Sequence, residues 1–135
     1  MSNNGHNDYG VSFSCIKFFE DRLSVHKMVK SVTRTNDILF HITLINKNYY
    51  DVLLVNDYTI SESAVFEYHR AFPSAEFIVT GASWNAYTSQ AKEAGNDLNI
   101  GIFNSSEFFG ALHWDEPKKY HKKDRNGNPI YETRN

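Results

Sequence analysis

The sequence predicts a mixed α/β domain in which a largely buried sheet lies between helices. Two observations lead to this prediction. Three apolar, β-branched segments follow one another at residues 25–57 with only short polar links, which favours an antiparallel arrangement. Strand patterns at 75–80 and 98–103 then alternate with helical patterns, which favours parallel crossovers. The expected order is helix, three strands, helix, strand, helix, strand and helix.

Length and composition are those of one packed domain. The chain has 135 residues, of which 41% are hydrophobic and 15% aromatic. No apolar run approaches the roughly 18 residues that span a bilayer, so we expect no membrane partner. Cys15 is the only cysteine, which excludes an internal disulfide and favours a cytoplasmic location. We expect a polar tail at 1–8, a single α/β domain at 9–114 and a basic, turn-rich tail at 115–135.

The first half of the chain is expected to hold one helix and three strands. Apolar residues recur at helical spacing over 9–23, which predicts an amphipathic helix. A mixed β-branched segment at 25–33 predicts the first strand. The segments 38–46 and 49–57 carry apolar residues on both faces, so both strands should be central. The sequence NKN at 46–48 is a short polar link that predicts a hairpin.

Capping signals locate the helices of the second half. Thr59 is expected to begin a helix that Pro73 ends, as the first residue of a capping box TISE. Ser83 is expected to cap the next helix, with Gly95 at its C-terminal end. The sequence NSSE at 104–107 predicts a second capping box and the last helix. The small residues around Ser83 also form a strand-to-helix turn of the kind that can hold an anion, although it lacks the spacing and lysine of a P-loop.

This order resembles the core of the PD-(D/E)xK restriction-endonuclease-like superfamily, α-β-β-β-α-β-α-β-α. The segment FIVTGASWNAYTSQAKEAGNDLNIGIFNSSEFFGAL, residues 77–112, resembles the closing part of the Mrr-type branch. In that branch a strand ending in threonine is followed by a helix, a strand and a short helix. The resemblance covers roughly residues 11–112 and implies a three-layer fold. It also implies a prokaryotic system that handles DNA, in defence or in a mobile element.

The resemblance implies where catalytic residues would lie. Enzymes of this superfamily cleave phosphodiester bonds with a divalent metal, using an acid near the second strand and an acid-x-Lys pair in the third. Asp37 and Asp51 would bind Mg²⁺, Asp57 is a further catalytic candidate, and Glu20 lies where some members add a carboxylate. The third strand holds no lysine. The acid-x-Lys pair is missing, since Leu53 stands two positions after Asp51. We therefore expect a catalytically degenerate, non-enzymatic domain without a cofactor, with an active Mg²⁺-dependent endonuclease as the alternative.

Two other functions fit parts of the sequence. Asp57 and Thr80 resemble the phosphorylated aspartate and the threonine of a receiver domain, which would make the chain a regulatory module. The paired acids and the lysine of receivers are absent from the corresponding strands. Alternatively, the acidic balance and the many aromatic residues suit a protein-binding inhibitor or immunity-type module.

The C-terminal tail is the predicted nucleic-acid contact. Its basic residues would neutralise phosphates, aided by an adjacent tyrosine and histidine, whereas the simpler interpretation is a solvated charge run. The formal net charge of −2 excludes a uniformly basic nucleic-acid binder. We expect a protein partner, a nucleic acid or both, and self-association is compatible with the sequence. The tail residues are Lys118, Lys119, Lys122, Lys123 and Arg125.

Overall fold

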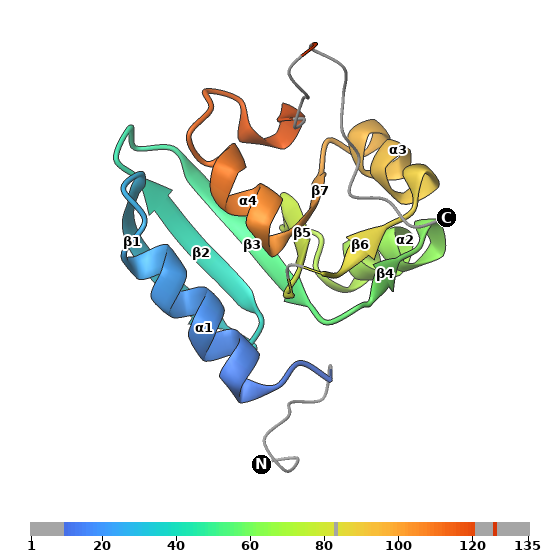
Figure 1. Ribbon diagram of the computed structural model, residues 1–135, viewed down its shortest axis with the longest axis horizontal. Helices are drawn as coiled ribbons and strands as arrows, with labels where there is room; N and C mark the ends of the chain where they lie inside the picture. Colours follow the sequence, from blue (N-terminus) through green and yellow to red (C-terminus); the bar gives the residue numbers. More distant parts are fainter. Residues whose placement is uncertain (1–9, 83, 121–125, 127–135) are drawn as a thin grey trace.

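A five-stranded mixed sheet with helices against both faces forms the body of the molecule (Figure 1). The computed structural model describes residues 10–82, 84–120 and 126. The strands run in the order β1-β2-β3-β5-β7. Their bounds are Val29–Thr35 for β1, Leu39–Leu44 for β2, Tyr49–Val55 for β3, Phe77–Thr80 for β5 and Gly101–Asn104 for β7. The predicted mixed α/β architecture is confirmed.

Four helices surround the sheet in the described part of the chain. They are α1 (Phe13–Ser24), α2 (Glu62–Ala71), α3 (Ser89–Asp97) and α4 (Ser105–Ala111), and a 3₁₀ turn, η1 (Pro117–Lys119), follows them. Two short strands, β4 (Thr59–Ile60) and β6 (Ala86–Tyr87), pair with each other in parallel outside the main sheet. None of the described helices has both the length and the apolar character needed to cross a bilayer.

The sheet combines two connection types, as predicted. β1, β2 and β3 are antiparallel neighbours joined by tight turns, whereas β3, β5 and β7 are parallel and joined through α2 and α3. Asn36 and Asp37 both have positive φ in the first turn, at 50° and 65°. Asn and Asp tolerate this region better than other non-glycine residues, which explains the RTND turn. Lys47 takes a φ of 76° in the second turn.

Phenylalanines hold α1 and α4 against the same face of the sheet. The Phe19 ring of α1 lies 5.1 Å from that of Phe40 in β2 and 5.8 Å from that of Phe108 in α4. Phe108 in turn lies 5.2 Å from Phe77 of β5. Phe19, Phe40, Phe77 and Phe108 are all buried, so the helical stripe predicted for the first helix does face the core.

The opposite face of β7 packs against α3, and here one expectation was wrong. Gly95 does not end its helix but lies within α3, where an added Cβ would come within 2.4 Å of Ile102 Cγ1. The glycine is required for close packing of helix on strand. The helix ends at Asp97, and Asn99 takes the left-handed conformation with a φ of 60°.

Helix starts were predicted correctly at one site and shifted at two. The capping box of Asn104 and Glu107 begins α4 as expected. Thr59 does not cap α2, because it pairs with Ala86 in the small sheet, and Ser61 is the cap instead. Thr88 caps α3, five residues after the predicted cap at residue 83, which lies outside the described residues. The starts of α2 and α3 are later than predicted because the residues before them form β4 and β6. The sequence around residues 59 and 83 did not indicate these two strands.

The packed domain extends past the predicted boundary at residue 114. Pro117 of η1 is buried, and the ring of Tyr120 lies 6.2 Å from that of Phe103 in β7. The first part of the predicted tail therefore packs on the edge of the sheet. Residues 121–125 lie outside the described part of the chain.

Candidate ligand-binding pocket

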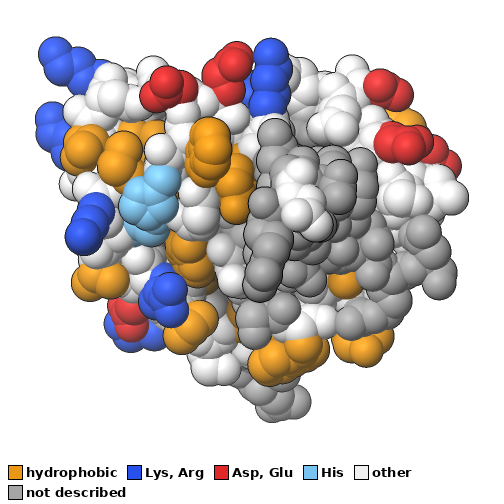
Figure 2. Space-filling model, turned by 45° about the horizontal axis from the view of Figure 1, so that its top comes forward, with side chains coloured by type: hydrophobic (Ala, Val, Ile, Leu, Met, Phe, Trp, Pro, Cys, Tyr) orange, Lys and Arg blue, Asp and Glu red, His pale blue; other side chains and the backbone are white. Residues whose placement is uncertain are grey.

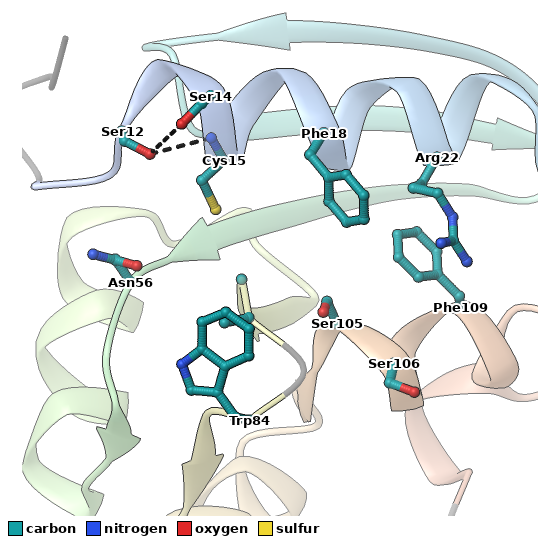
Figure 3. A pocket seen from close by; sticks show the side chains of 12 residues that line it. Ser12, Ser14, Cys15, Phe18, Arg22, Asn56, Trp84, Ser105, Ser106 and Phe109 are labelled. Carbon is teal, nitrogen blue, oxygen red and sulfur yellow. Dashed lines mark hydrogen bonds between the residues drawn. The ribbon is translucent and has the colours of Figure 1, made fainter.

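A pocket of about 670 Å³ lies between α1 and the start of α4, at the end of the sheet where β3 and β5 finish (Figure 3). Ligands of open α/β sheets bind beyond the carboxyl ends of parallel strands, because loops and helix starts diverge there. The volume is typical of small-ligand sites. The lining residues are Ser12, Ser14, Cys15, Phe18, Arg22, Asn56, Gly81, Ala82, Trp84, Ser105, Ser106 and Phe109.

Aromatic side chains form the walls of this pocket. Phe18 projects from α1 and is 54% exposed, and Trp84, on the opposite side, is 71% exposed. Phe109 of α4 is buried at the far end. Phe18 and Trp84 thus present aromatic surface to solvent at the rim of the cavity, the kind of surface on which planar ligands stack.

Arg22 is the one charged side chain among the lining residues. Its guanidinium lies 5.0 Å from the centroid of the Phe109 ring and 5.8 Å from that of Phe18. These cation–π contacts hold the guanidinium at the pocket without using its hydrogen-bond donors. Within the described residues, no carboxylate lies at ion-pair distance from Arg22. An anionic group is therefore the natural partner for this side chain.

The floor of the pocket is closely packed and chemically inert. A Cβ added at Gly81 would come within 2.5 Å of Cys15 Sγ, so only glycine lets the chain pass under the thiol. Cys15 is half-buried against the core, and burial raises the pKa of its thiol. The thiol is therefore protonated at neutral pH.

The two carboxylates implied as metal ligands do not come together. His41 pairs with Asp51 across the β2–β3 hairpin, whereas Asp37 lies in the turn before β2, four residues ahead of His41. Four residues of strand separate Asp37 from Asp51 by about 13 Å. The active-nuclease alternative requires them within a few ångströms of each other. No group of three or more His, Cys, Asp or Glu side chains in the described part of the chain could hold a metal ion.

Asp37 instead belongs to a surface ion-pair cluster. The Arg34 guanidinium lies 3.3 Å from Asp37 Oδ1 and 3.3 Å from Glu20 Oε2. Glu20, which lies where some members of the superfamily add a carboxylate, therefore neutralises Arg34 together with Asp37. The cluster ties the C-terminal half of α1 to the β1–β2 turn.

Asp51 is the centre of a polar network that includes a residue the sequence did not indicate. His41 Nδ1 lies 2.7 Å from Asp51 Oδ1 and 3.0 Å from the Tyr49 hydroxyl, and Thr35 Oγ1 lies 2.9 Å from His41 Nε2. Burial by itself raises the pKa of Asp51, but hydrogen bonds from His41, Ser74 and Tyr49 outweigh it and the pKa is lowered. In a hairpin whose turn is centred on residue 46, residues 41 and 51 are equally far from the centre and face each other. The predicted hairpin could therefore have indicated the His41–Asp51 pair.

Asp57 and Thr80 do lie side by side, as the receiver alternative required. The Thr80 hydroxyl, however, donates to the backbone carbonyl of Asp57 and not to its carboxylate. The carboxylate accepts a hydrogen bond of 2.6 Å from the Tyr68 hydroxyl. Burial raises the pKa of Asp57, the Tyr68 hydrogen bond lowers it in part, and the nearby charge of Glu67 raises it. The hydrogen bonds of Asp57 and Thr80 thus hold the loop after β3 in place.

The two described lysines of the basic tail have acidic partners. Lys118 Nζ lies 3.4 Å from Glu76 Oε1, and Lys119 Nζ lies 3.4 Å from Glu116 Oε1. These carboxylates reduce the positive potential available to a phosphate. The other tail residues of the prediction, Lys122, Lys123 and Arg125, lie outside the described residues.

Charge divides the molecule into two parts. Residues 10–50 contain six Lys or Arg and three Asp or Glu, whereas residues 51–116 contain two and ten. Figure 2 shows most of the basic side chains of this view on the left, the side of α1, β1 and β2 in Figure 1. Arg22 therefore belongs to a basic part of a protein whose net charge is negative.

Comparison with protein-family models, with curated proteins and with solved structures finds no match. The restriction-endonuclease-like relationship is therefore a prediction from residues 11–112. The function must be inferred from the pocket and from the charges around it.

Proposed function

We propose that this chain is a non-catalytic nucleic-acid-binding domain that holds a single-stranded segment in the pocket between α1 and α4. The observation that carries the proposal is a pocket with exposed Phe18 and Trp84 on opposite walls and Arg22 next to Phe18 on α1, with no carboxylate at ion-pair distance from Arg22 among the described residues. In this role the domain would be a binding or assembly subunit of a prokaryotic DNA-handling system, in defence or in a mobile element.

A nucleobase matches the aromatic walls. Every base offers a flat π-face, and stacking a base on an aromatic side chain contributes roughly 1–3 kcal/mol. Trp84 and Phe18 come from different segments and face the cavity from opposite sides (Figure 3). A base between them would be held without sequence-specific hydrogen bonds, so the domain should tolerate many sequences.

A phosphate matches the polar part of the site. Arg22 can donate two hydrogen bonds to phosphate oxygens, and the hydroxyls of Ser105 and Ser106 lie along the same cavity. The excess of basic residues in 10–50 would attract a polyanion to this side of the molecule and repel it from the acidic side.

The ion pairs made by Asp37 and Asp51 support a binding role without cleavage. Asp37 neutralises Arg34, and Asp51 is held by His41, with about 13 Å of strand between the two acids. Bringing these carboxylates onto one metal ion would require breaking both pairs and changing the hairpin register.

Fluorescence anisotropy of labelled single-stranded DNA and RNA oligonucleotides tests the proposal. We expect Trp84→Ala to weaken binding about 10-fold, because stacking contributes 1–3 kcal/mol. Arg22→Gln should also weaken binding and lower the dependence on salt by about one phosphate contact. Trp114→Ala, which removes an exposed tryptophan outside the pocket, is the matched control and should bind like the wild type.

Two results would contradict the proposal. Binding that is unchanged in both pocket variants would move the contact elsewhere, with the C-terminal tail as the next candidate. Cleavage of the oligonucleotide in Mg²⁺ that is abolished by Asp37→Asn would instead support the active endonuclease.

A further inference from the structure

A second exposed surface lies at the C-terminal end of α1, where the β2–β3 turn and the chain after α4 meet. Val25 is 78% exposed, Ile45 is 56% exposed and Trp114 is 60% exposed. We name these three residues, with Met28, the apolar face. Figure 2 shows hydrophobic, basic and histidine side chains gathered on the left of the molecule, the side that contains this end of α1.

Backbone and ring contacts hold the parts of this face together. The Ile45 N–H donates to the carbonyl of Met28 at 2.9 Å, which joins the β2–β3 turn to the start of β1. The rings of His26 and His113 lie 4.7 Å apart, which places Val25 and Trp114 on adjoining segments. Three separate parts of the sequence therefore meet at the C-terminal end of α1.

His26 makes the face rigid. Its Nε2 lies 2.8 Å from the carbonyl oxygen of Phe109, and its Nδ1 accepts the N–H of Met28 at 3.1 Å. Both ring nitrogens are thus used by the neutral imidazole, and the pKa of His26 is lowered, mainly by burial. The loop after α1 is fixed to α4, so little conformational entropy would be lost when a partner binds.

Three lysines without acidic partners among the described residues belong to the same segments as the apolar face. Lys27 lies between Val25 and Met28 in the sequence, and Lys30 and Lys47 follow in β1 and in the β2–β3 turn. No ion pair to any of the three lysines is present among the described residues. Both Lys118 and Lys119, by contrast, are paired with glutamates. The unpaired positive charge around an apolar centre is complementary to a negatively charged, apolar ligand.

We propose that the apolar face is a docking site for an acidic protein segment that carries an aliphatic or aromatic anchor residue. The anchor packs against Val25, Ile45 and Trp114, and its flanking carboxylates pair with Lys27, Lys30 and Lys47. A protein fits better than a nucleic acid because most of the face is aliphatic, with no stacking pair such as that of the pocket. None of the four residues of the apolar face lines the pocket.

Selection from a random peptide library displayed on phage tests this inference, with counter-selection against a Lys27→Glu/Lys30→Glu/Lys47→Glu variant. We expect the enriched peptides to combine Asp or Glu with a large apolar residue. In a Trp84→Phe background, the fluorescence of Trp114 should change on addition of a synthesised winning peptide. The charge-reversed variant should lose at least 10-fold in affinity, and Val25→Ser/Ile45→Ser should lose a similar amount. Arg70→Glu on α2 is the control for charge reversal and should bind normally.

Three outcomes would overturn the inference. One is the absence of enriched peptides, or enrichment of peptides without acidic residues. Another is equal binding of the winning peptide to the charge-reversed variant. The third is co-sedimentation with phosphatidylserine vesicles that depends on the same lysines while no peptide binds, because the occupant would then be an anionic lipid surface. A folded variant is verified by its unchanged circular dichroism spectrum.

Discussion

The antiparallel and parallel parts of the same sheet differ in how completely they are covered. Every residue of β5 and β7 is buried, whereas five of the seven residues of β1 are exposed. Parallel strands need crossovers, and each crossover brings a helix onto a face of the sheet. A tight hairpin joins its two strands without adding a helix to the sheet. The apolar face that we propose as a docking site lies beside the hairpins, whereas the pocket lies at the ends of the parallel strands β3 and β5, against α1.

Polar residues show the same contrast. In the antiparallel part, Asp51 and His41 form a network with side chains that reach solvent. In the parallel part, Glu107 accepts the Tyr87 hydroxyl at 2.9 Å, and Lys92 donates to the carbonyl of Ile102 at 2.6 Å, with all of these side chains buried. The polar side chains of the parallel part are thus more completely enclosed than those of the network around His41 and Asp51.

The largest expected effect is the removal of a core ring from the parallel part. Phe77→Ala should lower the free energy of unfolding by about 3–5 kcal/mol, because Phe77 is fully buried against the rings of Phe103 and Phe108. Val32→Ala, on partly exposed β1, should lower it by about 1 kcal/mol. Urea unfolding measures both values. Equal losses would contradict the contrast between the two parts.

A pH-dependent effect of intermediate size is expected at Lys92. Burial lowers its pKa to about 8, while the charge of Glu107 raises it in part. Between this value and the ordinary 10.5, the unfolded chain binds a proton that the folded chain does not, so stability rises with pH. The slope should approach about 1.4 kcal/mol per pH unit.

Unfolding at pH 8 to 9.5 measures this slope in the wild type and in two variants. Lys92→Met should flatten the curve, because the buried titrating group is gone. Lys30→Met on exposed β1 should keep the wild-type slope. A wild-type slope in Lys92→Met would show that another group is responsible.

The smallest expected effect comes from adding one methyl group to a glycine of α3 or of α4. Gly95→Ala should lower the free energy of unfolding by about 1 kcal/mol, because the overlap with Ile102 outweighs the better helix propensity of alanine. Gly110→Ala should raise it by up to about 1 kcal/mol, since its Cβ would make only ordinary contacts, with Tyr120 Oη at 3.6 Å and Tyr120 Cζ at 3.9 Å. Thermal unfolding compares the two. Stabilisation by both substitutions would mean that α3 packs less closely on β7 than described.

The candidate site was predictable only in part. The sequence resemblance singled out Asp37, Asp51 and Asp57, but it could not indicate that each is engaged by a neighbour. His41 escaped attention because its partner lies across a hairpin. Arg22 and Trp84 escaped it because no spacing rule joins residues 62 positions apart in the chain.

By itself, the sequence determined the order of the four helices and the five strands of the main sheet, the antiparallel and parallel connections and the capping box at Asn104. These features depend on periodicity and on hydrogen bonds between residues three or four positions apart, which a local pattern records. Only the tertiary structure decided that Thr59 joins a strand, that Gly95 lies inside a helix, and that a pocket forms between α1 and α4. Each of these depends on contacts between distant segments, whose packing overrides local preference.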